Sequence, residues 1–138
     1  MLASSSSVHY DNAAFQVNMT LISSDDAGLI FRISADGSQF YDFEINSQGQ
    51  FYLRYRNNGA YTNIIRPTSS SAIQRVGSQN TLLVIANGSD FQLFINGTFV
   101  GAAHDSTFTS GQLGVVAGTL SSTSGDASFT NLIVYPAG

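Results

Sequence analysis

The chain has 138 residues, of which 43% are hydrophobic and only 10% are charged, with a formal net charge of −4 and no cysteine. This length fits one domain with a single core. The five basic residues are all Arg and form no cluster, which argues against binding to nucleic acid or to an anionic membrane surface. The lack of cysteine excludes disulfides and thiolate metal sites, and no apolar run reaches the roughly 18 residues of a membrane span.

Residues 1–12 begin with the Ser-rich stretch MLASSSS and are predicted to be a linker or an added start, followed by one domain over residues 13–136. The stretch lacks the basic and apolar regions of a signal peptide. Richness in Ser, Thr, Asn and Gly with few charges is common in secreted bacterial modules. We therefore expect one module of a larger protein, located outside the cell or at its surface.

Short runs of alternating apolar and polar residues follow in chain order, with turn residues at intervals of roughly 8 to 12 residues. Dipeptides Asn58–Gly59, Asn87–Gly88 and Asn96–Gly97 favour type I′ hairpin turns. Only residues 69–76 have the composition for a helical turn. Strands are predicted at residues 15–21, 28–34, 39–46, 50–57, 60–66, 81–86, 91–95, 98–104, 112–117 and 126–135.

This pattern predicts an all-β domain, a two-sheet antiparallel β-sandwich. The inward positions of the strands supply the expected core: Phe15, Val17, Leu29, Phe31, Phe43, Leu53, Leu82, Val84, Leu93, Ile95, Val115 and Phe129.

Several stretches carry a resemblance to a known family: GLIFR (28–32), FINGTFVG (94–101), SGQLGVVAG (110–118) and a Phe-x-Asn-Leu strand (129–132). The sequence resembles the concanavalin A-like, laminin G-like jelly-roll modules, and more narrowly the bacterial family related to 3-keto-disaccharide hydrolases. The resemblance covers residues 13 to 135 and implies a jelly roll, with one more strand before residue 13 in many members. Members include lectins, carbohydrate-binding modules and glycosidases, so the resemblance specifies the fold more than the ligand.

Residues 40–64 have an unusual second face. If Leu29, Phe31, Ile33 and their counterparts line the core, the opposite face of the sheet carries charged and aromatic side chains together. Carboxylates and guanidinium groups hydrogen-bond sugar hydroxyls, and aromatic rings stack on sugar rings; in the resembled fold sugars bind on such a face. The predicted ligand-binding residues are Arg32, Asp42, Glu44, Tyr52, Arg54, Arg56 and Tyr61. The alternative is that cross-strand ion pairs only support a solvated sheet.

No enzymatic activity is expected. A glycosidase needs two carboxylates in different protonation states, and the neighbouring arginines would keep Asp42 and Glu44 both ionised. Jelly-roll endoglucanases carry a Glu-x-Asp-x-(x)-Glu strand, whereas this chain has a single Glu. His9 and His104 have no neighbouring ligand pattern and are interpreted as ordinary surface or loop residues.

No cofactor is expected, with calcium as the alternative. Asp25–Asp26, Asp105 and Asp126 lie near turns and have the oxygen ligands that Ca²⁺ takes, although Asp is also a normal turn residue.

The favoured interpretation is a non-catalytic extracellular recognition module for carbohydrate. The alternative is a structural or adhesive β-sandwich that links or self-associates and binds no sugar, because exposed sheet edges without Lys tolerate strand pairing. The expected partners are a glycan or another extracellular ligand, without nucleic acid or membrane insertion.

Overall fold

The computed structural model describes residues 2–4, 10–22, 26–117 and 127–136. Eleven strands lie in this described part of the chain, and none of its residues is helical. The strands are β1 (Leu2–Ser4), β2 (Ala13–Leu21), β3 (Ala27–Ile33), β4 (Gln39–Ile45), β5 (Gln50–Asn57), β6 (Ala60–Ser69), β7 (Gln79–Asn87), β8 (Asp90–Ile95), β9 (Thr98–His104), β10 (Gln112–Ala117) and β11 (Ala127–Pro136).

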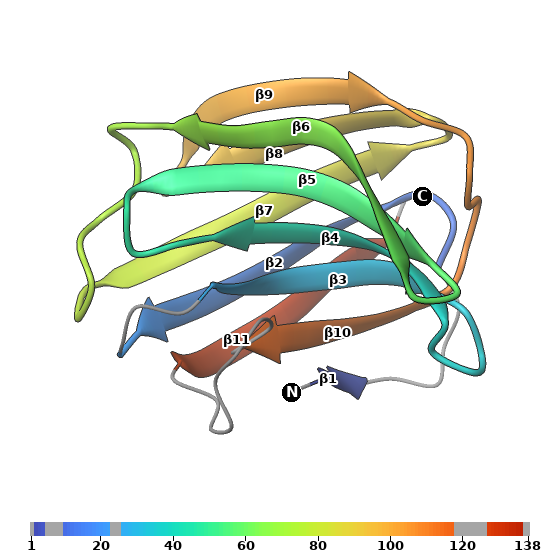
Figure 1. The fold of residues 1–138 in the computed structure, drawn as a ribbon, viewed down its shortest axis with the longest axis horizontal. Helices are drawn as coiled ribbons and strands as arrows, with labels where there is room; N and C mark the ends of the chain where they lie inside the picture. Colours follow the sequence, from blue (N-terminus) through green and yellow to red (C-terminus); the bar gives the residue numbers. More distant parts are fainter. Residues whose placement is uncertain (1, 5–9, 23–25, 118–126, 137–138) are drawn as a thin grey trace.

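The strands form two antiparallel sheets that stack face to face (Figure 1). One sheet has six strands in the order β1-β10-β3-β4-β5-β6, and the other has five in the order β11-β2-β7-β8-β9. Both sheets mix strands that are distant in sequence, as β10 lies beside β3 and β11 beside β2. The predicted two-sheet antiparallel β-sandwich of the jelly-roll type is confirmed. No helix long and apolar enough to cross a membrane is found in the described residues.

The segment predicted to be a linker contributes to the sandwich where it is described. Leu2, Ala3 and Ser4 form β1 and pair with Val116, Val115 and Gly114 of β10. Tyr10 forms a bridge with Gly111, with hydrogen bonds in both directions. Residues 2–4 therefore lie in an edge strand of the six-stranded sheet.

The core lies between the sheets and is built from alternate residues of each strand. In β2 every second residue from Ala13 to Leu21 is buried, as a half-buried strand requires. Phe31 stands at the centre, with its ring stacked 5.7 Å from that of Phe15 and 5.3 Å from that of Tyr41. All twelve predicted core residues pack in this cluster, with Val115 and Phe129 only partly buried.

Two of the predicted hairpin turns have the expected backbone. Asn58 and Gly59 have φ angles of 53° and 90°, and Asn96 and Gly97 have 53° and 80°, as a type I′ turn needs. The third differs, because Asn87 still belongs to β7 and only Gly88 of that dipeptide has a positive φ.

Alternation breaks at Arg32, near the end of β3. Arg32 has a φ of 53°, and the pairing with β10 shifts register between Gln112 and Leu113, which is the signature of a β-bulge. A side chain at Gly111 would place its Cβ 2.4 Å from the carbonyl carbon of Arg32, so only glycine fits beside the bulge. The bulge reverses the two faces from this point onward.

The expected positions of Arg32 and Ile33 were therefore wrong. Arg32 is buried, and its guanidinium lies 5.1 Å from the centre of the core ring of Phe91. It donates hydrogen bonds to the carbonyl oxygens of Asp11 (2.7 Å) and Phe108 (3.0 Å). Ile33 joins a small apolar cluster separate from the main core, with Ile30, Phe40 and Val116.

Candidate functional site

The strands β4, β5 and β6 bring six of the seven predicted site residues together on the side of the six-stranded sheet that faces away from the core. The register sets their order: Asp42 lies opposite Arg54, and Glu44 lies opposite Tyr52. On the next strand, Tyr61 lies opposite Arg56 and Asn63 opposite Arg54. We call this group the β4–β6 face; its residues are Asp42, Glu44, Tyr52, Arg54, Arg56, Tyr61 and Asn63. Arg32 is not part of it, because the bulge turns its side chain toward the core.

Arg54 is the centre of the β4–β6 face. Its Nε donates a 2.8 Å hydrogen bond to Asp42 Oδ2, and its Nη2 lies 3.4 Å from Glu44 Oε2. The guanidinium carbon lies 3.8 Å from the centre of the Tyr61 ring and 4.9 Å from that of Tyr52. Arg54 is thus held by two carboxyl groups and packed between two rings, so its position is fixed before any ligand arrives.

Both carboxyl groups are buried: Asp42 is 1% exposed and Glu44 is 0% exposed. Burial raises the pKa of Glu44 well above its ordinary value, and the neighbouring Asp42, by charge and by hydrogen bond, raises it further. Burial also raises the pKa of Asp42, which the hydrogen bond with Glu44 and the charge of Arg54 oppose. Of the two carboxyl groups, Glu44 therefore holds a proton more strongly.

Burial thus acts against the expected ionisation of both carboxyl groups, and its effect is larger than that of the charge of Arg54. A proton on Glu44 also explains two buried oxygens, Asp42 Oδ1 and Glu44 Oε1, that have no other partner. A protonated carboxyl that donates to its neighbour satisfies both. The pair then carries one negative charge, which Arg54 neutralises.

Glu44 also depends on a glycine on the neighbouring strand. Gly28 pairs with Glu44, and a Cβ at Gly28 would lie only 2.7 Å from the Glu44 Cα. The backbones of β3 and β4 are therefore too close at this point for any side chain at position 28.

Tyr52 is buried, at 4% exposed, and its hydroxyl donates a 2.8 Å hydrogen bond to Asp26 Oδ2. It was predicted to offer a stacking ring to a ligand, but the structure uses it to cover Arg54. Asp26 was missed as part of this network, because nothing in the sequence links the start of β3 to the middle of β5.

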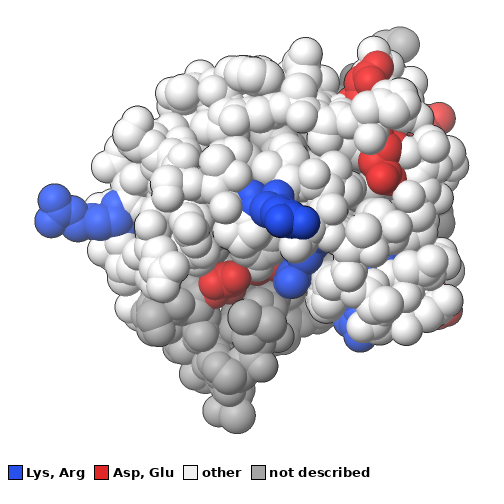
Figure 2. Space-filling model, turned by 45° about the horizontal axis from the view of Figure 1, so that its top comes forward, with Lys and Arg blue, Asp and Glu red and all other residues white. Residues whose placement is uncertain are grey.

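The accessible part of the face lies above this buried network. Tyr61 is 43% exposed, Arg56 is half-buried and Asn63 is exposed. The guanidinium carbon of Arg56 lies 5.6 Å from the centre of the Tyr61 ring. The side of the molecule seen in Figure 2 is mostly uncharged. Basic groups lie near its centre, and a small acidic group lies beside them.

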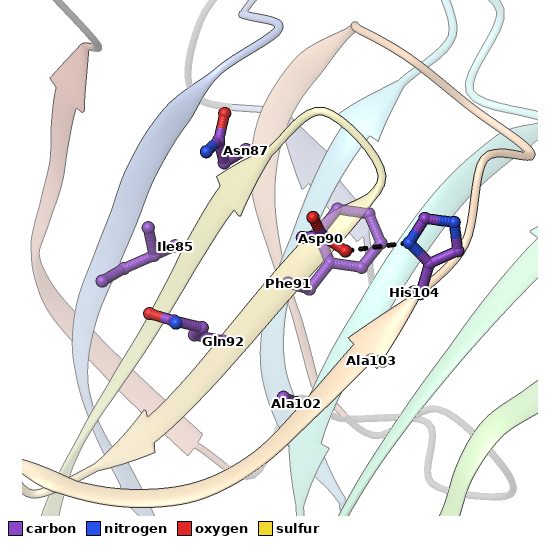
Figure 3. Close-up of a pocket in the computed structure, with 8 residues that line it drawn as sticks. All are labelled: Ile85, Asn87, Asp90, Phe91, Gln92, Ala102, Ala103 and His104. Atoms are coloured by element: carbon purple, nitrogen blue, oxygen red, sulfur yellow. Dashed lines mark hydrogen bonds and ion pairs between the residues drawn. The ribbon is translucent and has the colours of Figure 1, made fainter.

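A hollow of about 560 Å³ lies over β7, β8 and β9 of the five-stranded sheet. Figure 3 shows Ile85, Asn87 and Gln92 beside the pair formed by Asp90 and His104, whose Oδ1 and Nδ1 are 2.8 Å apart. Both side chains of this pair are about three-quarters exposed (74% and 75%), so solvent screens their interaction. None of the residues that line this hollow has a buried polar atom without a partner. The polar side chains of this hollow are thus exposed to solvent, unlike the buried network of the β4–β6 face.

The aspartates expected near calcium have other partners where they are described. Asp26 accepts the hydrogen bond from Tyr52, and Asp105 accepts a 2.6 Å bond from the Tyr41 hydroxyl. Asp25, Asp126 and His9 lie outside the described residues. In the described part of the chain, no group of three or more acidic or histidine side chains is arranged to hold a metal ion.

The fold is similar to that of several solved structures. The carbohydrate-binding module CBM66 from Bacillus subtilis aligns over 94% of this chain and 78% of its own, with a TM-score of 0.79 and 22% identity. Sheep galectin-11 aligns over 97% and 94%, with a TM-score of 0.63 and 14% identity. The β-glucanase of Bacillus licheniformis aligns over 99% and 77%, with a TM-score of 0.66 and 12% identity.

No protein-family model and no curated protein matches the sequence. At the identities of the structural neighbours, the similarity establishes a fold and not a ligand. The fold is a concanavalin A-like jelly roll.

Proposed function

We propose that this chain is a carbohydrate-recognition domain without catalytic activity, and that the β4–β6 face is its binding site. The proposal rests on one observation: a buried charge network lies beneath accessible polar and aromatic groups. The accessible groups are the Tyr61 ring, the Arg56 guanidinium and the Asn63 amide. A site built in this way pays little entropy when a ligand binds, because its buried groups are already ordered.

The accessible groups suit a sugar. The Tyr61 ring offers an apolar surface for the C–H groups of a sugar ring, and its hydroxyl remains available as a donor and acceptor. Arg56 and Asn63 add donors and an amide oxygen for hydroxyl groups. A structural neighbour with 22% identity is named as a carbohydrate-binding module, which supports the same class of ligand.

The absence of catalysis is proposed from the position of the carboxyl groups. A glycosidase places two carboxyl groups against the scissile bond. Asp42 and Glu44 are 1% and 0% exposed, with Arg54 held against them. An extracellular location and a closer kinship to the family related to 3-keto-disaccharide hydrolases are proposed from composition and sequence resemblance.

A second candidate function is structural or adhesive, and one observation favours it. Phe99, on the edge strand β9, is 54% exposed and its ring lies 5.6 Å from that of Phe94 on β8. An exposed aromatic ring on an edge strand suits strand pairing with a second molecule. Sedimentation velocity over a wide concentration range separates the candidates, since an adhesive domain self-associates and a lectin-like monomer does not.

A glycan array followed by calorimetric titration tests the carbohydrate proposal. Tyr61→Ala should weaken binding of the best glycan by about 1 to 3 kcal/mol. Phe99→Ala is a matched control, because it removes another exposed ring, from the other sheet. If no glycan binds the wild-type protein, the proposal fails and the adhesive candidate takes its place.

A further inference from the structure

Arg56 is a cation without an acidic partner. Asp42 and Glu44, the two acidic residues of the β4–β6 face, are both engaged by Arg54. Among the described residues, Arg56 forms no ion pair, and its buried Nε has no hydrogen-bond acceptor. A buried donor without an acceptor destabilises a fold unless something else supplies the acceptor.

The immediate neighbours of Arg56 do not supply one. Phe40 lies directly opposite on β4, and Tyr61 lies directly opposite on β6. The Phe40 ring is buried in the small apolar cluster with Ile30, Ile33 and Val116. Arg56 therefore stands between an apolar and an aromatic neighbour, where an ionic interaction is stronger than in open solvent.

The charges of the face leave Arg56 uncompensated. Both carboxyl groups pair with Arg54, at 2.8 Å for Asp42 and 3.4 Å for Glu44, and neither forms an ion pair with Arg56. Asp26 is tied to the Tyr52 hydroxyl and makes no ion pair with Arg56. The accessible part of the face thus has one positive charge available to a ligand, in a protein whose overall charge is −4.

We propose that the glycan recognised by the β4–β6 face is acidic, and that its carboxylate or sulfate group pairs with Arg56. This inference rests on the proposed carbohydrate-binding function. A neutral hydroxyl can accept one hydrogen bond from the guanidinium, but only an oxyanion both accepts a forked pair of hydrogen bonds and neutralises the charge.

The test is an array in which each uronate-containing, sialylated or sulfated glycan is printed beside the same glycan without its acidic group. Wild-type protein should bind an acidic member at least tenfold more tightly than its neutral partner, and the ratio should shrink as salt is added. Whether the carboxylated or the sulfated pairs show the ratio identifies the anion.

Two variants tie this preference to Arg56. Arg56→Gln should abolish the ratio, and Arg56→Lys should retain part of it, since the charge remains but the planar fork is lost. Arg75→Gln is the matched control, because it removes an exposed positive charge from the loop before β7. Thermal unfolding of each variant verifies its fold.

The outcomes separate the two proposals. Equal binding of acidic and neutral partners, or a preference that survives in Arg56→Gln, overturns the assignment of an acidic ligand and leaves the carbohydrate function standing. Absence of binding to every glycan overturns the carbohydrate function, and the acidic ligand with it.

Discussion

Arg54 and Asp42 lie directly opposite each other on β5 and β4, with the Nε of one 2.8 Å from the Oδ2 of the other. The Asp42 side chain is 1% exposed and that of Arg54 13% exposed, so water cannot replace either partner. Burial lowers the pKa of Arg54, but the charge and hydrogen bond of Asp42 outweigh it and raise the pKa overall. The pair is therefore part of the structure of the sheet, and recognition falls to the groups above it.

Removing one partner of this pair should be costly. Arg54→Met leaves the Asp42 carboxylate buried without a counter-charge and should lower the free energy of unfolding by about 3 to 5 kcal/mol. The double variant Arg54→Met, Asp42→Asn should recover most of that loss, because no buried charge remains. Urea unfolding measures both. A loss below about 1 kcal/mol in the single variant would show that the ion pair is not structural.

Ionisation of Glu44 should lower the stability of the folded protein as the pH rises. Burial raises the pKa of Glu44 in the folded protein above the ordinary 4.5, so the folded state holds a proton that the unfolded chain releases. The resulting stabilisation is fully present below pH 4.5 and is lost as the pH rises through the folded-state pKa. Glu44→Gln keeps a neutral group in place and should reduce this slope, which urea midpoints from acidic to alkaline pH will measure.

Asp36 should affect stability only at acidic pH, because its pKa is lowered. Hydrogen bonds from the Ser38 side chain and backbone, and from Ser34, lower its pKa from 3.8 to about 2. Its contribution to stability is present above pH 3.8 and is lost only below it, whereas that of Glu44 is lost only above pH 4.5, so the two changes can be measured separately. An identical slope above pH 4.5 in wild type and Glu44→Gln would contradict the protonated Glu44.

The aromatic core should dominate stability. Truncating Phe31 or Phe43, both completely buried, to Ala should cost about 3 to 5 kcal/mol. Tyr52→Phe removes only the hydroxyl that donates to Asp26 and should cost about 1 kcal/mol. Chemical denaturation ranks the three variants, and a ranking with Tyr52→Phe as the most damaging would mean that the two faces of the sheet are reversed.

Arg32 should matter for stability and not for ligand binding. Arg32→Met removes the donors to the carbonyl oxygens of Asp11 and Phe108 and should cost about 2 to 4 kcal/mol. Glycan affinity of the folded variant should equal that of wild type, because the side chain points toward Phe91 in the core. If the variant had normal stability but no longer bound the glycan, Arg32 would have to be counted among the ligand-binding residues.

Much of the fold is predictable because strand formation leaves local signals. Strands alternate with period two, and Asn58–Gly59 and Asn96–Gly97 occupy turns that need positive φ angles. Residues 50–57, 98–104 and 112–117 match their predicted strands, and other boundaries move by one to three residues. The register of β4 and β5 follows from the same alternation, which is why Asp42, Glu44, Tyr52 and Arg54 were predicted to share a face.

The incorrect predictions concern properties that the alternation of apolar and polar residues does not determine. A one-residue bulge at Arg32 exchanges the faces of Arg32 and Ile33, and it requires glycine at position 111, just before β10, where a Cβ would clash with the backbone of Arg32. Burial of Tyr52 and protonation of Glu44 depend on how three strands pack together, including the contact of Tyr61 with Arg54. These properties depend on tertiary contacts, which cannot be predicted from the sequence of a single strand.

Mapping a bound glycan by NMR shows directly whether it contacts the β4–β6 face. Backbone amide shifts of the wild-type protein would be followed during titration with the best glycan from the array. We expect the largest shifts on β4, β5 and β6, around Arg56, Tyr61 and Asn63. Shifts centred instead on β7, β8 and β9, around Gln92 and His104, would contradict this expectation and place the binding site on the opposite sheet.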